Sequence, residues 1–188
     1  TMEAAISIAV GIGLSAATGF RLFVPLLLAG LAAHAGFIEL SDGFSWLAST
    51  PALIMLGTAA VFETLAYYMP GLDHLLDVIA GPLSVVAGVL ASGAVMADVN
   101  PALMWPIAIL AGGGIADATK GSSAVIRAKT LLATAGLGNP VVSTAETFSA
   151  VTLSVLAIAL PLLALVAVVA LLVWVIRKAL RLGLRQKS

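Results

Sequence analysis

The sequence predicts an all-α membrane protein, a small polytopic helical bundle with broken or re-entrant helices. Of its 188 residues, 61% are hydrophobic and only 10% are charged. An average soluble domain carries about 25% charged residues, and a soluble globule with far fewer would expose large apolar patches and aggregate. Eighteen glycines and eight prolines are spread along the chain and interrupt its apolar runs. This composition excludes a soluble enzyme domain, a disordered chain and a nucleic-acid-binding protein.

The first two apolar segments are each too short for a comfortable membrane span, which needs about 20 residues. They cover residues 4–18 and 22–35, and Gly19-Phe20-Arg21 separates them. Two interpretations stay open: the halves of a hairpin that dips into the bilayer, or two thin spans packed against protein. The following loop, residues 37–50, contains acidic but no basic side chains, which favours the outer face of the membrane.

The next segments are predicted to be helices that bring the total to about four to seven crossings. Residues 51–69 form a clear span, and Asp73 caps a helix that runs to Met96. Residues 102–119 form the following span, which ends at a polar, basic stretch at 120–129.

The last apolar stretch, residues 141–176, contains Pro161. As a single helix it would measure ~54 Å, longer than the ~30 Å hydrocarbon core. As a hairpin it would need a turn at residues 160–162, where no glycine or polar side chain helps to satisfy free backbone groups. Because unsatisfied backbone in lipid is costly, we favour a kinked helix, or a helix that begins outside the core, over a hairpin.

The charges are divided unequally along the chain. Residues 1–176 carry four basic and nine acidic side chains, whereas the tail 177–188 carries five basic and no acidic ones. A basic tail after an apolar run follows the positive-inside rule and can also touch anionic lipid head groups. We therefore expect one multi-pass domain, residues 1–188, in a bacterial inner membrane with a cytoplasmic C-terminus.

A faint similarity links the two halves of the chain, residues 4–97 and 101–178. Residues 11–18 and 112–119 share a Gly-x-Gly pattern, an aliphatic residue and an Ala-Thr pair. Internal repeats are common among transporters, but a chain rich in glycine and alanine also produces such matches by chance. Both explanations, duplication and chance, stay open.

Three stretches of the sequence resemble those of a known family. They read GFRLFVP at residues 19–25, YYMPGLDHLLD at 67–77 and GLGNPVV at 136–142. Together they resemble a bacterial membrane-protein family known as domain of unknown function 4126, and the similarity covers nearly the whole chain. The resemblance implies a multispanning membrane protein, and because the family has no assigned chemistry it lends no functional residues.

An ionisable side chain inside a spanning segment is expensive, so each one is a candidate functional group. Carboxylates beside hydroxyls form an oxygen-rich wall that can replace the hydration shell of a cation. The alternative is a carboxyl that only joins helices, either protonated or paired with arginine. The candidates for ion binding or transport are Arg21, Glu63, Asp73, His74, Asp77, Asp117 and Glu146.

Asp117 lies on a ridge of small residues, between Gly113 and Gly121 at four-residue spacing. Small residues let helices approach closely in membranes, so we expect this ridge to face protein. Lys120 and Arg21 are the candidate partners for an ion pair with Asp117.

Asp73-His74-x-x-Asp77 offers two or three metal ligands, because imidazole together with carboxylates suits zinc or a transition metal. The alternative is structural: an acid before a helix and another in its first turn stabilise the helix N-terminus. No second ligand cluster is visible nearby in the sequence, which weakens the metal interpretation.

The leading hypothesis for function is a small transporter or channel for a cation or a proton-coupled solute, with intramembrane carboxylates as its binding groups. The acidic excess of residues 1–176 and the glycine-interrupted segments in both halves favour it. The alternative is a lipid-binding or lipid-translocating protein in which Arg21 meets a lipid phosphate, and a scaffold subunit without a solute path is a third option. We expect membrane lipids and a cation as partners, and no cofactor or nucleic acid. We also expect no enzymatic activity, with an intramembrane enzyme as the alternative that stays open.

Assembly is a separate expectation. Ser84, Gly88 and Ser92 form a ridge of small side chains at four-residue spacing, which suits tight helix packing. Short segments cannot shield their own backbone from lipid, and two-fold dimers are the commonest assembly. We therefore expect a homodimer that packs through this ridge, and the alternative is that the ridge packs within the monomer.

Overall fold

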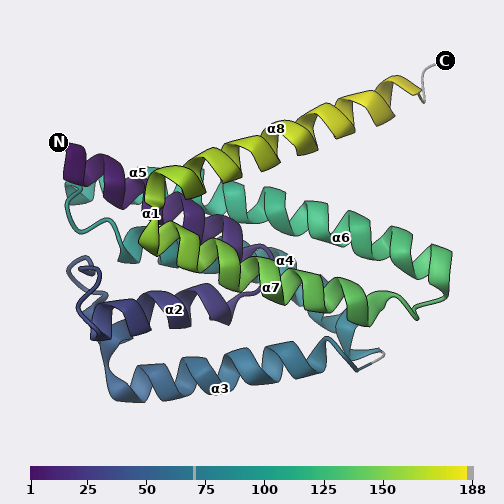
Figure 1. Cartoon of the computed structure of the whole chain (residues 1–188), viewed down its shortest axis with the longest axis horizontal. Coiled ribbons are helices and arrows are strands. Elements are labelled where there is room, and N and C mark those ends of the chain that lie inside the picture. The colour runs from purple at the N-terminus through teal and green to yellow at the C-terminus, as the bar shows by residue number, and fades with distance from the viewer. Residues whose placement is uncertain (70, 186–188) are drawn as a thin grey trace.

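The computed structural model describes residues 1–69 and 71–185, and this part of the chain is helical with no strand. Within it, four helices are long and apolar enough to cross a membrane, which confirms the all-α membrane bundle (Figure 1). The elements in chain order are α1 (Met2–Thr18), α2 (Phe23–His34), η1 (Ser45–Ala48), α3 (Thr50–Ala66), α4 (Leu72–Ala94), α5 (Pro101–Ile107), the π-helical η2 (Ala108–Gly113), α6 (Gly114–Thr134), α7 (Asn139–Ala159) and α8 (Pro161–Arg185).

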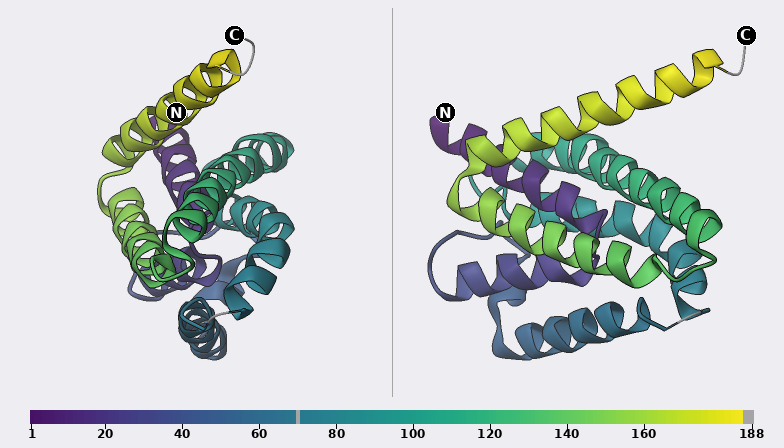
Figure 2. Two further views of the ribbon diagram at one scale, coloured as in Figure 1. Left: turned by 90° about the vertical axis from the view of Figure 1, so that its right-hand side faces the viewer. Right: turned by 45° about the vertical axis from the view of Figure 1, so that its right-hand side comes forward.

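The two short N-terminal helices form a re-entrant hairpin. α1 runs from one end of the bundle into its interior, the chain reverses at residues 19–22, and α2 returns to the starting end (Figure 1, Figure 2). This reversal supports the hairpin interpretation. The tip of the hairpin lies inside the bundle, and Arg21 at this tip is only 1% exposed.

Small side chains allow α1 to occupy the centre of the bundle. Leu14, Ala16 and Ala17 are completely buried, and α1 packs against α4, α7 and α8. A Cβ atom on Gly13 would lie 2.6 Å from the Cβ of Ala157 on α7. A residue without a side chain is therefore required at position 13 for α7 to approach this closely.

From α3 onward the chain runs back and forth between the two ends of the bundle. α3 starts at the end where α2 finishes, α4 returns, and α5, η2 and α6 continue one another in the opposite direction (Figure 1, Figure 2). α7 and α8 then run in opposite directions, so that the N-terminus and the end of α8 lie at opposite ends of the molecule.

The polar, basic stretch at residues 120–129 does not end a helix, because α6 continues through it to Thr134. Lys120, Ser123 and Arg127 are spaced so that they share one helical face, and all three are buried. Each of the three side chains has at least one hydrogen-bond partner inside the bundle, as described below, and these polar residues therefore do not interrupt the helix.

The preference for a kinked helix at Pro161 is wrong, because the chain turns there and α8 folds back beside α7 (Figure 1). The N–H of Leu160 donates to the carbonyl of Leu156 at 2.8 Å, and the carbonyl of Leu160 accepts from the N–H of Ala164 at 3.0 Å. Pro161 has no N–H to satisfy and suits the first turn of α8. The turn therefore leaves none of these backbone groups unsatisfied, which removes the objection to a hairpin.

The ridge expected at a dimer interface packs inside the monomer instead. Ser84 and Ser92 are completely buried. A Cβ atom on Gly88 would lie 2.5 Å from the Cβ of Ala116 and 2.8 Å from the carbonyl oxygen of Gly112. The ridge is thus occupied by η2 and α6 of the same chain. A homodimer stays a prediction, but this ridge is not its surface.

Gly88→Ala should destabilise the protein, because the added methyl group overlaps atoms of η2 and α6. We expect the free energy of unfolding to fall by about 1–3 kcal/mol, the usual cost of overpacking. The control is Gly81→Ala on the same helix, where a Cβ atom meets nothing within 4 Å. Thermal unfolding in detergent measures both, and equal midpoints for the two variants would contradict this packing.

Candidate functional site

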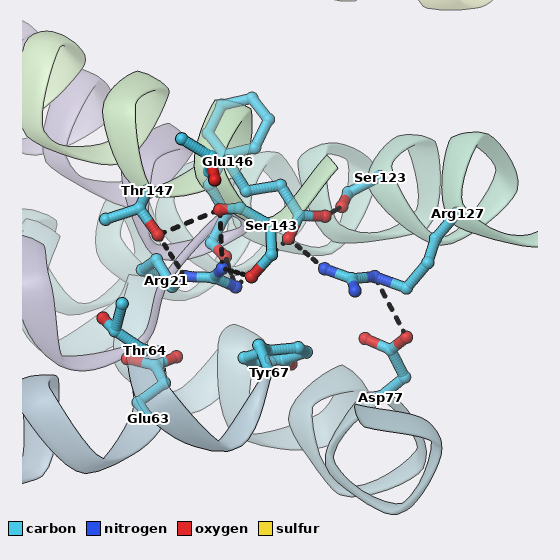
Figure 3. A network of polar contacts seen from close by, with 12 residues as sticks. Arg21, Glu63, Thr64, Tyr67, Asp77, Ser123, Arg127, Ser143, Glu146 and Thr147 are labelled. Carbon is cyan, nitrogen blue, oxygen red and sulfur yellow. Dashed lines mark hydrogen bonds and ion pairs between the residues drawn. The ribbon is translucent and has the colours of Figure 1, made fainter. Parts of the chain in front are cut away.

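Arg21 anchors the tip of the hairpin to α7. Its Nε donates to Oγ1 of Thr147 at 2.9 Å, and its Nη2 donates to Oγ and the carbonyl oxygen of Ser143 at 2.6 and 2.8 Å (Figure 3). Its Nη1 lies 3.1 Å from Oε2 of Glu146. Ser143, Glu146 and Thr147 share one face of α7 because they are three and four residues apart. One face of α7 therefore forms the binding site for this guanidinium.

Glu146 is shared between two arginines. Its Oε2 also accepts from Nη2 of Arg127, and its Oε1 accepts from the hydroxyl of Ser123. Both of these partners come from the buried face of α6. A single carboxylate on α7 thus joins the tip of the α1–α2 hairpin to α6 and α7 below the surface of the bundle.

Asp77 on α4 extends this series of contacts. Its Oδ2 lies 3.2 Å from Nε of Arg127, and its Oδ1 accepts from Nζ of Lys120 at 2.8 Å. The side chains form a continuous ion-pair chain in which positive and negative groups alternate. Its members, in order, are Arg21, Glu146, Arg127, Asp77 and Lys120.

The ring of Tyr67, which follows α3, lies against all three cations of the ion-pair chain. Its centroid is 4.3 Å from Cζ of Arg21, 4.8 Å from Cζ of Arg127 and 5.5 Å from Nζ of Lys120. The negative face of an aromatic ring attracts cations, most strongly where water is excluded, and Tyr67 is only 3% exposed. Tyr67 therefore helps to hold three positive charges within one small volume.

Glu63 has a different role, because it caps α2. Its Oε1 accepts from the N–H of Leu22 at 2.7 Å and its Oε2 accepts from the N–H of Phe23 at 3.1 Å. These are free N–H groups at the start of a helix, where a negative charge is also favoured by the helix dipole. Glu63 therefore fixes α3 to the tip of the re-entrant hairpin.

A cavity of about 360 Å³ lies between α3 and α4, and we name it the lateral pocket. Its inner wall includes Glu63 and Tyr67, and its other walls are apolar. The outer wall includes Phe62, Ile79 and Leu83, which are exposed on the face of the bundle that carries apolar side chains. The lateral pocket thus leads from the lipid-facing surface to the residues that contact the ion-pair chain.

Two buried donors of Arg127, Nε and Nη1, make no hydrogen bond within the described part of the chain, and of the two only Nε has an ion-pair contact, 3.2 Å from Oδ2 of Asp77. The side chain is 3% exposed, and its Nη1 makes neither kind of contact with any described residue. A buried, charged donor that is left unpaired costs free energy. Nη1 is therefore a place where an additional acceptor would be bound favourably.

The structure brings together four of the residues that the sequence singled out, Arg21, Glu63, Asp77 and Glu146. Asp117 does not join them, and the expectation that its whole ridge faces protein is wrong, because only Gly113 is buried, against Val85 and Val89 of α4. Asp117 and Gly121 are exposed, and Lys120 pairs with Asp77. The reason is that the polar face of α6, with Lys120, Ser123 and Arg127, is the one turned inward.

The metal interpretation receives no support from the described residues, none of which form a group of three or more His, Asp or Glu side chains suited to a metal ion. Asp77 is engaged with two cations. The side chains of Asp73 and His74 lie outside the described part of the structure, so their part in the prediction stays open.

Sequence reasoning missed Arg127, Lys120, Ser123 and Tyr67 as members of the site. A signal for three of them was present, because Lys120, Ser123 and Arg127 recur at positions i, i+3 and i+7. This is the spacing of one helical face, and a polar face between apolar segments indicates a helix whose partners lie inside the bundle. Tyr67 also had a signal, because it lies four residues after Glu63 and so shares its helical face, whereas Tyr68 does not and is exposed.

Glu146→Gln should strongly destabilise the protein, since it removes the charge that Arg21 and Arg127 share inside the bundle. Breaking a buried ion pair by removing one partner costs about 3–5 kcal/mol. Asp117→Asn is the matched control, because Asp117 is exposed and forms no ion pair with any described residue. Chemical unfolding in detergent measures both variants, and an unchanged Glu146→Gln would mean that the cluster contributes no net stability.

Comparison with known proteins gives one match. A family model described as Domain of unknown function (DUF4126) matches residues 8–181, a range that includes the whole ion-pair chain. No curated protein and no solved structure matches the chain. The resemblance noted in the sequence is therefore confirmed, and the chain belongs to the DUF4126 family of domains of unknown function.

Proposed function

We propose that this membrane protein binds the anionic head group of a lipid-like molecule at its buried charge cluster and moves it across the membrane. The observation that carries the proposal is the unpartnered Nη1 of Arg127, buried in a cation-rich cluster beside the lateral pocket. Guanidinium groups pair well with phosphate and carboxylate oxygens. A head group with such oxygens completes the hydrogen bonding of Arg127.

The state of the carboxylates supports an anionic over a cationic ligand. Glu146 already accepts from Arg21 and Arg127, and Asp77 already pairs with Arg127 and Lys120. An incoming cation would have to displace these positive side chains. An incoming anion can instead exchange with a carboxylate on the same arginine, at a smaller electrostatic cost.

The lateral pocket supports a ligand with an apolar part. Its walls are apolar apart from Glu63 and Tyr67, and it opens on the lipid-facing side between α3 and α4. An apolar tail is stabilised there, while the head group reaches Tyr67 and the cations behind its ring. Access from the bilayer therefore fits an amphiphile better than a small hydrated ion.

Transport of a cation or of a proton-coupled solute is the second candidate, and Glu63 favours it. Glu63 lines the lateral pocket. Among the described residues it accepts from two backbone N–H groups and forms no ion pair with a basic side chain. Its carboxylate is thus the one in the cluster that a proton or a cation reaches without displacing an arginine.

We further propose the inner membrane of a bacterium as the location, with the C-terminus in the cytoplasm. The end of the bundle where α6 and α8 finish carries Lys129, Arg177 and Lys178, and the opposite end carries Glu39 and Asp42 (Figure 1). Basic residues are retained on the cytoplasmic side. This distribution supports the orientation that the basic tail predicts.

Arg127→Gln should slow lipid movement in liposomes that contain fluorescently labelled phosphatidylglycerol. We expect the rate at which the label reaches the other leaflet to fall about 10–100-fold, the range for losing a hydrogen bond to a charged group. Arg181→Gln, an exposed arginine on α8, is the control and should keep the parent rate. Arg127→Lys keeps the positive charge, so this variant should stay folded but should still move the lipid more slowly than the parent. It therefore separates a loss of head-group binding from a loss of the fold.

The same liposomes distinguish the second candidate. If the labelled lipid moves no faster than in empty vesicles, the lipid proposal fails. A proton or cation flux that Glu63→Gln abolishes and Arg127→Gln leaves intact would then support transport through Glu63.

A further inference from the structure

A second cavity lies on the opposite side of α6 from the ion-pair chain. It has a volume of about 250 Å³ and lies between α6 and α8, and we name it the terminal groove. α8 diverges from α6 toward the C-terminal end (Figure 1, Figure 2). The walls of the groove are apolar and include Val125, Ile126, Trp174 and Val175. Apolar side chains of this kind can bind a hydrocarbon chain.

Two lysines line the terminal groove. Lys129 comes from α6 and Lys178 from α8, and both side chains are exposed. Lys178 is also the last residue of the apolar span Pro161–Lys178. Trp174, one turn earlier, is half exposed and holds Nζ of Lys178 4.4 Å from its ring centroid. Tryptophan and lysine at the end of a span mark the depth of the lipid head groups.

We propose that the terminal groove binds an anionic phospholipid, with an acyl chain along its apolar walls and the phosphate between Lys129 and Lys178. The charge at the groove argues for this occupant over a second copy of the chain, since a two-fold contact there would bring four ammonium groups together. An anionic head group neutralises them instead. The site is independent of the proposed function, because the groove and the ion-pair chain use opposite faces of α6.

Trp174 provides the measurement. The chain has three tryptophans, and Trp46→Phe with Trp105→Phe leaves Trp174 as the only one. Bromine on a lipid chain quenches indole fluorescence at short range. In liposomes or micelles of fixed composition, brominated phosphatidylglycerol should therefore quench Trp174 at lower mole fraction than brominated phosphatidylcholine. The expected preference is about fivefold for each lysine at low salt, and it should weaken as salt is added.

Lys129→Gln with Lys178→Gln in this background should remove the preference while leaving quenching by phosphatidylcholine unchanged. Arg177→Gln is the matched control, because Arg177 is exposed on α8 and does not line the groove. Arg127→Gln should also keep the preference, which separates this site from the charge cluster. Equal quenching by both lipids in the parent, or a preference that survives the double lysine change, overturns the proposal.

Discussion

The buried charge of Arg21 is the constraint on which the rest of the bundle depends. A guanidinium inside an apolar protein is tolerated only if its N–H groups are satisfied and its charge is neutralised. Ser143, Glu146 and Thr147 meet that requirement, so α7 must lie against the tip of the hairpin. Glu146 is then close enough to neutralise a second arginine, Arg127, which places the polar face of α6 beside it. The charge at the hairpin tip thus positions α7, and the carboxylate of α7 positions α6.

The position of α3 follows from a different interaction and has a consequence for access. Glu63 fixes α3 to the start of α2 through two backbone N–H groups, and Tyr67 extends this contact to the cations. α3 is therefore attached on its α2 side, while it meets α4 only weakly along its length. The lateral pocket is the space that this arrangement leaves, and its inner wall is formed by the same two residues.

The sequence predicts which kinds of residue and segment this protein contains better than it predicts which helices contact each other. The low charge content indicates the membrane, and the interruption at Gly19-Phe20-Arg21 indicates the hairpin. The turn at Pro161 was not predictable from residue types, because the groups that satisfy Leu160 are backbone atoms of its own flanking helices. The orientation of the ridge at Asp117 was not predictable for a similar reason. The spacing of small residues indicates close packing, but it does not say which side of a helix is turned inward.

The long separation between Arg21 and its partners also sets an order of assembly. Glu146 follows Arg21 by 125 positions in the chain, and ribosomes extend a chain at about 5–20 residues per second. The α1–α2 hairpin is made before α7, and its arginine has no carboxylate on α7 until the chain has grown by 125 more residues. The hairpin therefore reaches the membrane before the helix that neutralises its arginine, and until α7 arrives Arg21 must be kept in contact with water, lipid head groups or the insertion machinery.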